Sequence, residues 1–268
     1  GEYLETAARV DTVVVDKTGT LTTGRPELTD VLVLDTRFTA DEVLQLAARA
    51  ETASEHPLAE AIIRGAQQRG LPVAVVDQAR PVVGRGIIAR VDGHDITVGA
   101  ADLLTTDPRA PQLEQLNREG KTAMYVGVDG QPVGVVAVAD TIRADAPGAI
   151  TALHGRGIRV VMATGDAEPV ARAVAESLGV DEVHAQLLPE DKLDLVASLQ
   201  AQGRVVAMVG DGVNDTPALA RADIGVAMGA AGSPAAIETA DIALMADRLP
   251  RLVHALHLAR RTVRTMRV

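Results

Sequence analysis

The chain contains no cysteine and no tryptophan, and its one phenylalanine and two tyrosines make up 1% of 268 residues. Without cysteine, disulfides, thiolate metal sites and cysteine nucleophiles are excluded. So few aromatic side chains argue against a stacking platform for single-stranded nucleic acid. The formal net charge of −10 at pH 7 points the same way, because nucleic-acid binders present a basic surface. We therefore expect no nucleic-acid partner.

Long apolar runs are also missing from the sequence. No run reaches the roughly 18 residues that a bilayer-spanning helix needs, and the N-terminus lacks the apolar segment of a signal peptide. The hydrophobic fraction of 47% and the charged fraction of 23% are ordinary for a globular protein. These features predict a soluble, acidic protein of a reducing compartment, with one large domain or two smaller ones.

Lysine is scarce in this sequence. The 26 basic residues include three lysines, which are Lys17, Lys121 and Lys192. In a chain that otherwise uses arginine, a lysine is either retained by chance on a solvated surface or marks a place that needs a compact ammonium group. Lys17 and Lys192 lie in motifs discussed below and Lys121 belongs to a candidate binding set given there, which favours the second explanation.

Short runs rich in β-branched residues alternate with segments of helical periodicity, a pattern that predicts an α/β fold with a doubly wound, mostly parallel sheet. The expected strands are Val10–Val15, Val133–Ala139, Ile158–Ala163, Val205–Val209, Ile224–Met228 and Ile242–Met245. The expected helices are Ala144–His154, Glu168–Leu178, Glu190–Gln200 and Thr216–Ala220.

Between about residues 24 and 132 the pattern changes to two helices and several strands joined by hairpin signals such as Asp92-Gly93 and Asp129-Gly130. This predicts an inserted α+β domain with an antiparallel sheet, so that residues 1–24 and 136–268 form one domain and residues 25–135 the other. The expected helices are Ala40–Ala53 and Leu58–Gln68, and the expected strands are Leu28–Leu34, Pro81–Arg90, Asp95–Val98, Lys121–Val128 and Gln131–Val138.

The C-terminal segment after Asp247 contains six arginines and no acidic residue. Its apolar residues recur at helical spacing: Leu252, Leu256, Ala259, Val263 and Met266. A basic amphipathic helix of this kind either packs on the protein core or forms a stalk that approaches a membrane from the cytoplasm.

Polar residues follow several of the expected strands, where ligands bind in doubly wound sheets. Asp16 directly follows the first strand, and an aspartate there can act as a nucleophile that forms an acyl phosphate. Asp140 and the Thr164-Gly165-Asp166 turn follow two other strands, and the turn offers a hydroxyl and backbone amides to a phosphoryl group.

The Gly210-Asp211-Gly212-Val213-Asn214-Asp215 turn follows a fourth strand and brings two carboxylates together. Hard oxygen ligands of this kind suit Mg²⁺, and Lys192 is a cation able to neutralise an aspartate–phosphate pair. Each of these turns alone is an ordinary loop. Their combination after successive strands predicts a magnesium-dependent phosphoryl-transfer site.

The segment Asp16-Lys17-Thr18-Gly19-Thr20-Leu21-Thr22 resembles the phosphorylation signature of P-type ATPases, within the haloacid dehalogenase-like superfamily. Thr164-Gly165-Asp166, Lys192 and Gly210–Asp215 resemble the later motifs of that family, in the same order. The resemblance implies that ATP phosphorylates Asp16, that Asp16, the Thr18 carbonyl and Asp211 hold Mg²⁺, and that Lys192 is the stabilising cation. It places in the catalytic set Asp16, Lys17, Thr18, Thr164, Gly165, Asp166, Lys192, Asn214 and Asp215.

The segment Ser54-Glu55-His56-Pro57-Leu58 resembles a signature of the heavy-metal-transporting P-type ATPases. This resemblance implies that the insertion binds the nucleotide, with His56 beside the adenine and Glu51 in contact with it. An ordinary helix-capping histidine is the alternative for His56. The implied nucleotide-binding set is Glu51, His56, Gly84, Gly86, Lys121, Asp140 and Arg143.

Taken together, the motifs resemble the ATP-binding and aspartyl-phosphorylation module of a heavy-metal cation-transporting P-type ATPase, a cytoplasmic part of an integral cell-membrane protein. The implied partners are ATP, the transported cation, and the transmembrane and actuator domains of the parent. Ala100 replaces an asparagine usual in copper transporters, which favours zinc, cadmium or cobalt, with copper next.

Two alternatives from other classes remain. A free-standing haloacid dehalogenase-like phosphatase is disfavoured, because such enzymes carry a second aspartate where this chain has Thr18. A non-catalytic nucleotide-sensing module is disfavoured, because Asp16, Lys192 and Asp211 are all present.

Overall fold

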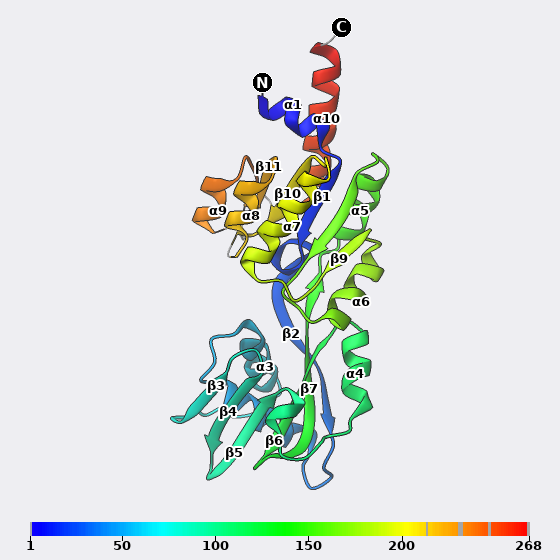
Figure 1. Ribbon diagram of the computed structural model, residues 1–268. Helices are drawn as coiled ribbons and strands as arrows, with labels where there is room; N and C mark the ends of the chain where they lie inside the picture. Colours follow the sequence, from blue (N-terminus) through cyan, green and yellow to red (C-terminus); the bar gives the residue numbers. More distant parts are fainter. Residues whose placement is uncertain (1, 213, 230–232, 246–247, 267–268) are drawn as a thin grey trace. The chain divides into compact units, whose positions relative to one another are not determined.

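A computed structural model describes residues 2–212, 214–229, 233–245 and 248–266 (Figure 1). Contacts divide the chain into two compact units: unit 1 contains residues 1–24 and 142–268, and unit 2 contains residues 25–141. The chain therefore leaves unit 1 after its first strand and returns to it after unit 2, as expected for an inserted domain.

Unit 1 is built on a sheet of parallel strands in the order β12-β11-β10-β1-β8-β9. The central strand β1 is fully buried, so its sequence Thr-Val-Val-Val-Asp shows no polar alternation. The strands are β1 (Thr12–Asp16), β8 (Arg159–Ala163), β9 (Glu182–His184), β10 (Val206–Gly210), β11 (Ile224–Met228) and β12 (Ile242–Leu244).

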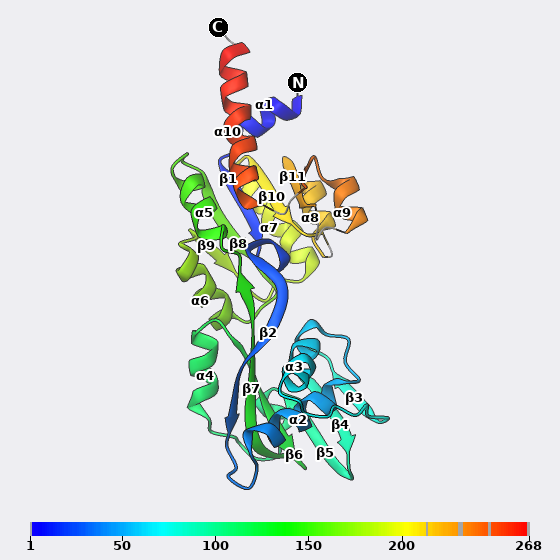
Figure 2. The ribbon, with the colours of Figure 1, turned by 180° about the vertical axis from the view of Figure 1, so that it is seen from behind.

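Helices cover both faces of this sheet, as Figures 1 and 2 show from opposite sides. On one face Val13 and Val15 pack in a core with α5 (Ala146–His154), α6 (Glu168–Leu178) and α10 (Leu249–Met266). On the other face Val14 and Met208 pack in a core with α7 (Pro189–Ala201), α8 (Thr216–Arg221) and α9 (Pro234–Thr239). The predicted doubly wound α/β fold is confirmed.

Aspartates secure the amino end of the parallel sheet. Each of four strands is preceded by an aspartate whose carboxylate accepts a hydrogen bond from a backbone amide at the start of a neighbouring strand. These bonds satisfy amides at the sheet end. The four pairs are Asp11 Oδ1 with Val205 N (3.2 Å), Asp181 Oδ2 with Val160 N (2.8 Å), Asp223 Oδ2 with Val206 N (2.8 Å) and Asp241 Oδ2 with Gly225 N (2.8 Å).

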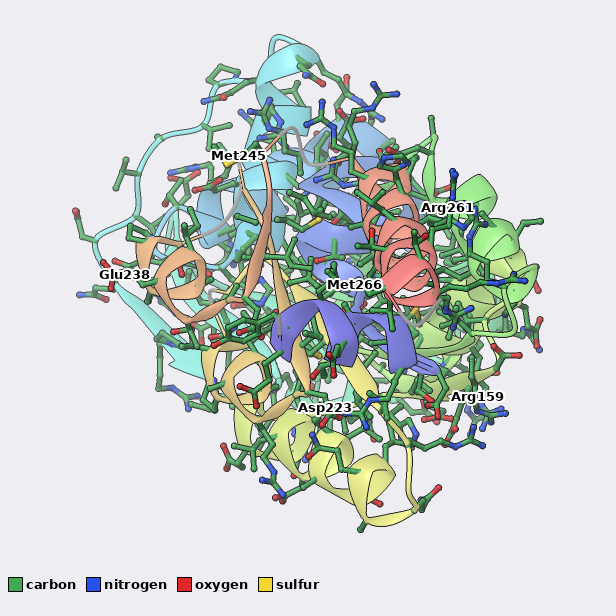
Figure 3. All side chains as sticks on the ribbon, turned by 90° about the horizontal axis from the view of Figure 1, so that it is seen from above. Arg159, Asp223, Glu238, Met245, Arg261 and Met266 are labelled. Atoms are coloured by element: carbon green, nitrogen blue, oxygen red, sulfur yellow. The ribbon has the colours of Figure 1, made fainter. Side chains whose placement is uncertain are left out.

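The terminal helix α10 packs against α5 and against α1 (Glu2–Arg9). Of the predicted apolar stripe, Leu252, Leu256 and Ala259 are buried, whereas Met266 is 73% exposed. Figure 3, seen from above, labels Met266 and Arg261 on the C-terminal part of α10. In the part of the chain that the structure describes, no helix combines the length and the apolar character needed to cross a membrane.

Unit 2 contains a second sheet, in the order β2-β7-β6-β5-β4-β3, in which each neighbouring pair of strands from β3 to β7 is antiparallel. Helices α2 (Ala40–Glu51) and α3 (Pro57–Gln68) pack on one face, and α4 (Pro111–Arg118) packs in a separate apolar cluster with β6. The strands are β2 (Thr22–Val33), β3 (Ala79–Val82), β4 (Gly86–Val91), β5 (His94–Gly99), β6 (Thr122–Val128) and β7 (Gln131–Ile142).

Two expectations about strands were wrong. Val133–Ala139 was expected in the parallel sheet as well as in the insertion, but β7 pairs with β6 in the antiparallel sheet of unit 2. By contacts, unit 2 extends to Thr141, near the end of β7. Pro81–Arg90 was expected as one strand, but a turn at Gly84, with φ of +70°, separates β3 from β4.

Candidate active site

The site of unit 1 lies at the end of β1. From β1 the next two strands of this sheet, β8 and β9, are added on one side, and the later strands β10, β11 and β12 are added on the other side. Asp16 ends β1, which lies between β8 and β10. Thr164 directly follows β8, and Asp211 directly follows β10, so both lie at the same edge of the sheet as Asp16. Such a switch point is where open α/β sheets bind their ligands. Asp140 does not belong to this edge, because it lies in β7 of unit 2.

Lys192 stands between two carboxylates at this edge. Its Nζ lies 3.0 Å from Asp16 Oδ1 and 2.8 Å from Asp215 Oδ1. The side chains of Lys192 and Asp16 are each 8% exposed, and that of Asp215 is 0% exposed. Lys192 is in the first turn of α7, whose start is capped by Asp191 through a hydrogen bond from the Leu188 amide.

Burial and neighbouring charges shift the pKa values of Asp16 and Lys192. Burial raises the pKa of Asp16 well above its usual value, the neighbouring Asp215 carboxylate raises it further, and the Lys192 ammonium opposes both. For Lys192, burial alone lowers the pKa, but the charges and hydrogen bonds of Asp16 and Asp215 outweigh it and raise the pKa. The lysine is therefore positively charged at neutral pH.

Three carboxylates of the site are arranged as ligands for a divalent cation. One oxygen from each of Asp16, Asp211 and Asp215 lies within 4.8 Å of the other two. None of the residues that the structure describes gives the buried Oδ2 of Asp215 a hydrogen bond. A hard cation such as Mg²⁺ takes oxygen ligands of this kind, so the residues fit the predicted magnesium ion.

Two glycines permit the close approach of these groups. A Cβ on Gly19 would lie 2.4 Å from Asp211 Oδ2, and one on Gly210 would lie 2.4 Å from Asp215 Oδ2. Gly19 also has a φ of +76°, which disfavours any residue with a side chain. We infer that both positions need glycine for the carboxylates to lie where they do.

The turn Lys17–Leu21 follows Asp16 and is fixed by Thr22. The Gly19 amide donates to Thr22 Oγ1 at 3.2 Å, and the Thr22 hydroxyl donates to the Lys17 carbonyl at 3.2 Å. The Thr18 side chain is exposed, whereas Thr20 is fully buried. Thr22 was not among the predicted site residues, although its place at the end of the signature was visible in the sequence.

Lys17 and the Thr164 turn are joined by an ion pair. Lys17 Nζ lies 2.5 Å from Asp166 Oδ2, and the Asp166 amide donates to Thr164 Oγ1 at 3.1 Å. The structure therefore brings Lys17, Thr164 and Asp166 together beside Asp16. Gly165 and Asn214, the other two predicted members, are exposed at the same edge of the sheet.

The predicted nucleotide residues of unit 2 include a buried acid. Glu51 ends α2 and is 7% exposed, and burial raises its pKa to about 7 despite an opposing hydrogen bond with Ser54. His56 precedes α3, and its Nδ1 accepts a hydrogen bond from the Leu58 amide at 3.2 Å. The helix-capping role weighed for His56 is therefore present, and its exposed ring remains accessible.

Replacing Glu51 with glutamine is expected to stabilise the chain at pH 8 but not at pH 5. A carboxyl whose folded pKa of about 7 exceeds its ordinary value of 4.5 binds protons more tightly in the folded state, so the free energy of unfolding falls as pH rises through this window. The gain at pH 8 is up to about 3 kcal/mol. Urea unfolding of both proteins at the two pH values measures it, and an equal effect at both would contradict the shift.

Of the remaining predicted nucleotide residues, Gly86, Lys121 and Arg143 have defined local partners, whereas a Cβ added to Gly84 would meet nothing within 4 Å. Gly86 and Gly99 pair across β4 and β5, and a Cβ on either would lie 2.1 Å from a carbonyl oxygen, so this pair needs glycine for strand approach. Lys121 Nζ lies 2.9 Å from Asp30 Oδ1 and 3.1 Å from Glu119 Oε2. Arg143 belongs to unit 1, where it binds the turn after Asp16.

Comparisons with known proteins find relatives over nearly the whole chain. The profile described as "Hydrolase: haloacid dehalogenase-like hydrolase" matches residues 10–223. The probable copper-exporting P-type ATPase V of Mycobacterium tuberculosis is 46% identical over 99% of this chain and 35% of its own length. The manganese-exporting P-type ATPase of Mycobacterium bovis is 43% identical over 100% of this chain and 38% of its own.

A solved structure extends the comparison to the fold. The crystal structure of a zinc-transporting PIB-type ATPase in the E2.Pi state matches with a TM-score of 0.79 and 42% identity, over 99% of this chain and 43% of that one. This chain therefore spans between a third and a half of the length of the proteins it resembles.

Proposed function

This chain belongs to the haloacid dehalogenase-like hydrolase family, and we propose that it is the ATP-binding and aspartyl-phosphorylation part of a heavy-metal cation-transporting P-type ATPase. The observation that carries the proposal is the buried Lys192 ammonium held between Asp16 and Asp215, with Asp211 beside them. The similarity to P-type ATPases over nearly the whole chain supports the same function.

In the proposed reaction a carboxylate oxygen of Asp16 attacks the terminal phosphorus of ATP. The bond between that phosphorus and the bridging oxygen breaks, and ADP leaves with the electron pair. Lys192 favours the ionised form of Asp16 and neutralises charge as the acyl phosphate forms.

Asp16, Asp211 and the Thr18 carbonyl would hold the magnesium ion. When bound, it neutralises charge on the transferring phosphoryl group. Asp215 contributes a third nearby carboxylate and orients Lys192. Lys17, the residue after the nucleophile, forms an ion pair with Asp166 of the Thr164 turn.

Unit 2 is proposed to bind the nucleotide, through Glu51, His56, Gly84, Gly86, Lys121 and Asp140. As part of a transporter, the chain would work with transmembrane and actuator domains on the cytoplasmic side of a cell membrane. One of the two relatives is named as a copper exporter and the other as a manganese exporter, and the solved structure is of a zinc transporter. The preference for zinc, cadmium or cobalt drawn from Ala100 stays a prediction.

The direct test is to label the purified chain with γ-phosphate-labelled ATP and Mg²⁺, quench it in acid and locate the label by mass spectrometry. We expect label on Asp16 that hydroxylamine removes, as an acyl phosphate requires. Label on another residue, or none while ATP is bound, would overturn the proposal.

Replacing His56 with alanine is expected to weaken ATP binding about tenfold, because a ring stacked on a base contributes on the order of 1–3 kcal/mol. The reaction of acetyl phosphate at Asp16 should persist, because acetyl phosphate has no base to recognise. Calorimetry measures the affinity, and hydroxylamine-sensitive labelling measures the reaction.

His56→Asn is the matched variant, because asparagine retains an acceptor for the start of α3 and lacks the ring. If the ring contacts the base, His56→Asn loses as much affinity as His56→Ala. Recovery of affinity in His56→Asn would assign the loss to the helix start. His94→Ala controls for loss of a surface histidine, because His94 is exposed at the start of β5 in the same unit and pairs with Asp129.

A further inference from the structure

Arg143 lies in the polypeptide segment that re-enters unit 1, and its guanidinium is directed at the turn after Asp16. Its Nε donates to the Thr22 carbonyl at 3.1 Å, and its Nη2 donates to the Gly19 carbonyl at 3.3 Å. Its backbone amide donates to the Leu21 carbonyl at 2.9 Å. Three carbonyls of the segment Gly19–Thr22 are therefore bound by one residue distant in sequence.

The guanidinium suits this task because it is planar, permanently charged and presents several donors in a fixed fork. Hydrogen bonds from a charged donor are stronger than those between neutral groups. Thr22 Oγ1 adds the bonds to the Gly19 amide and the Lys17 carbonyl. The backbone of the turn is thus held from two sides.

Gly19 links this anchor to the reacting carboxylates. Its Cα lies so close to Asp211 that an added Cβ would be 2.4 Å from Oδ2. A displacement of Gly19 therefore either strikes the Asp211 carboxylate or releases it, and in both cases changes its spacing from Asp16. Anchoring the Gly19 carbonyl fixes that spacing.

We propose that Arg143 is a positioning residue, which holds the segment Lys17–Thr22 in the geometry that phosphoryl transfer to Asp16 requires, and that it does not bind the nucleotide. This inference rests on the proposed function, and it replaces the nucleotide-binding role expected from sequence. Its place in the chain strengthens it. Arg143 follows the unit boundary at Thr141 by two residues, and Thr22 precedes the boundary at Gly24 by two, so the anchor joins both chain crossings at their base in unit 1.

The experiment compares Arg143→Gln and Arg143→Lys with the unmodified 268-residue chain. We expect Arg143→Gln to lower the rate constant of Asp16 phosphorylation at saturating ATP by about 10- to 100-fold, the scale of a misplacement near 1 Å. The dissociation constant for ATP should stay within about twofold, because no nucleotide contact is lost. Arg143→Lys should be intermediate, because one ammonium cannot reproduce a two-pronged contact.

Arg172→Gln is the matched control, because this exposed arginine on α6 pairs with Glu168 on the surface of the same unit. It should leave both quantities unchanged. A tenfold weaker affinity for ATP in Arg143→Gln, with an unchanged rate at saturation, would overturn the inference and restore the nucleotide role. If Arg143→Gln fails to fold, the same comparison is made with Arg143→Lys.

Amide hydrogen exchange supplies a readout that does not depend on phosphorylation. Residues 17–22 should exchange at least about fivefold faster in Arg143→Gln than in the unmodified chain, with β8 and β10 unchanged. Equal exchange in the turn would overturn the anchor even if the unmodified chain is phosphorylated. Conversely, if the unmodified chain takes no label from ATP, the proposed function is refuted. Faster exchange of residues 17–22 in Arg143→Gln would still support the anchor in that case.

Discussion

Replacing Lys192 with methionine is expected to slow phosphorylation of Asp16 by about 10³-fold and to destabilise the fold by about 3–5 kcal/mol. The rate falls because the variant loses a preorganised cation beside the reacting oxygen. The stability falls because Asp16 and Asp215, both nearly inaccessible to water, are left as buried carboxylates without their shared counterion. Methionine is also unbranched and is only one heavy atom shorter than lysine, so the change removes charge with little loss of volume.

The loss of stability in Lys192→Met should depend on pH. Burial and Asp215 raise the pKa of Asp16 while Lys192 lowers it, so the pKa of Asp16 rises further in the variant. A carboxyl whose folded pKa exceeds its unfolded value contributes stability at low pH and loses it as pH rises through the folded pKa. The deficit should therefore be larger at pH 8 than at pH 5, measured by urea unfolding of both proteins.

A second substitution separates charge from packing. Adding Asp215→Asn to Lys192→Met removes one of the two uncompensated carboxylates, so it should recover part of the stability and none of the phosphorylation rate. A pH-independent loss, or no recovery in the double variant, would show that Lys192 acts through packing. Lys192→Arg tests geometry, since the larger guanidinium keeps the charge but must fit a space occupied by an ammonium group.

The architecture of unit 1 follows from the pattern of its sequence. Fully apolar strands separated by amphipathic helices require burial on both faces, and a parallel sheet with helices on both faces meets that requirement. The error at β7 has a related cause. Val133, Val135, Val136, Ala137 and Val138 are all 1% exposed or less, because the two faces of β7 pack in separate apolar clusters of unit 2. A strand buried on both faces shows no alternation, so its sequence does not reveal which sheet it joins.

Some residues of the site could be predicted from the sequence and others could not. Asp16, Lys192 and Asp211 were visible in the sequence because the nature of the side chain itself carries the chemistry. The role of Arg143 was not visible, because its partners are carbonyl oxygens, which every residue possesses. The scarcity of lysine was informative for Lys17 and Lys192, which are buried in ion pairs. Lys121 instead pairs with Asp30 and Glu119, and its ammonium remains partly exposed.

Thr18 should make the phosphoenzyme of this chain long-lived. Hydrolysis of an acyl phosphate needs a group that activates water, and a threonine hydroxyl does not ionise near neutral pH. The Thr18 side chain is exposed two residues after the nucleophile, where solvent can reach it. We therefore expect slow release of phosphate from the unmodified chain. We expect no stimulation by zinc, cadmium or copper ions, because no helix that the structure describes could cross a membrane and carry them.

Replacing Thr18 with aspartate is expected to speed breakdown of the phosphoenzyme by about 10²-fold. General base catalysis contributes about 10²–10⁴-fold when the base is well placed, and the lower end suits a carboxylate placed by substitution alone. The measurement is the decay of hydroxylamine-sensitive label on Asp16 after unlabelled ATP is added. Thr18→Asn is the matched control, because it has nearly the same shape as aspartate and supplies no base.

The pH profile of that decay identifies the base. In Thr18→Asp the decay rate should increase with pH as the new carboxyl ionises. The unmodified chain and Thr18→Asn should show no such increase. If the phosphoenzyme of the unmodified chain instead decays as fast as that of Thr18→Asp, the chain already contains a hydrolytic base of its own. It would then act as a complete phosphatase, and the proposal that it is one part of a larger cation transporter would fail.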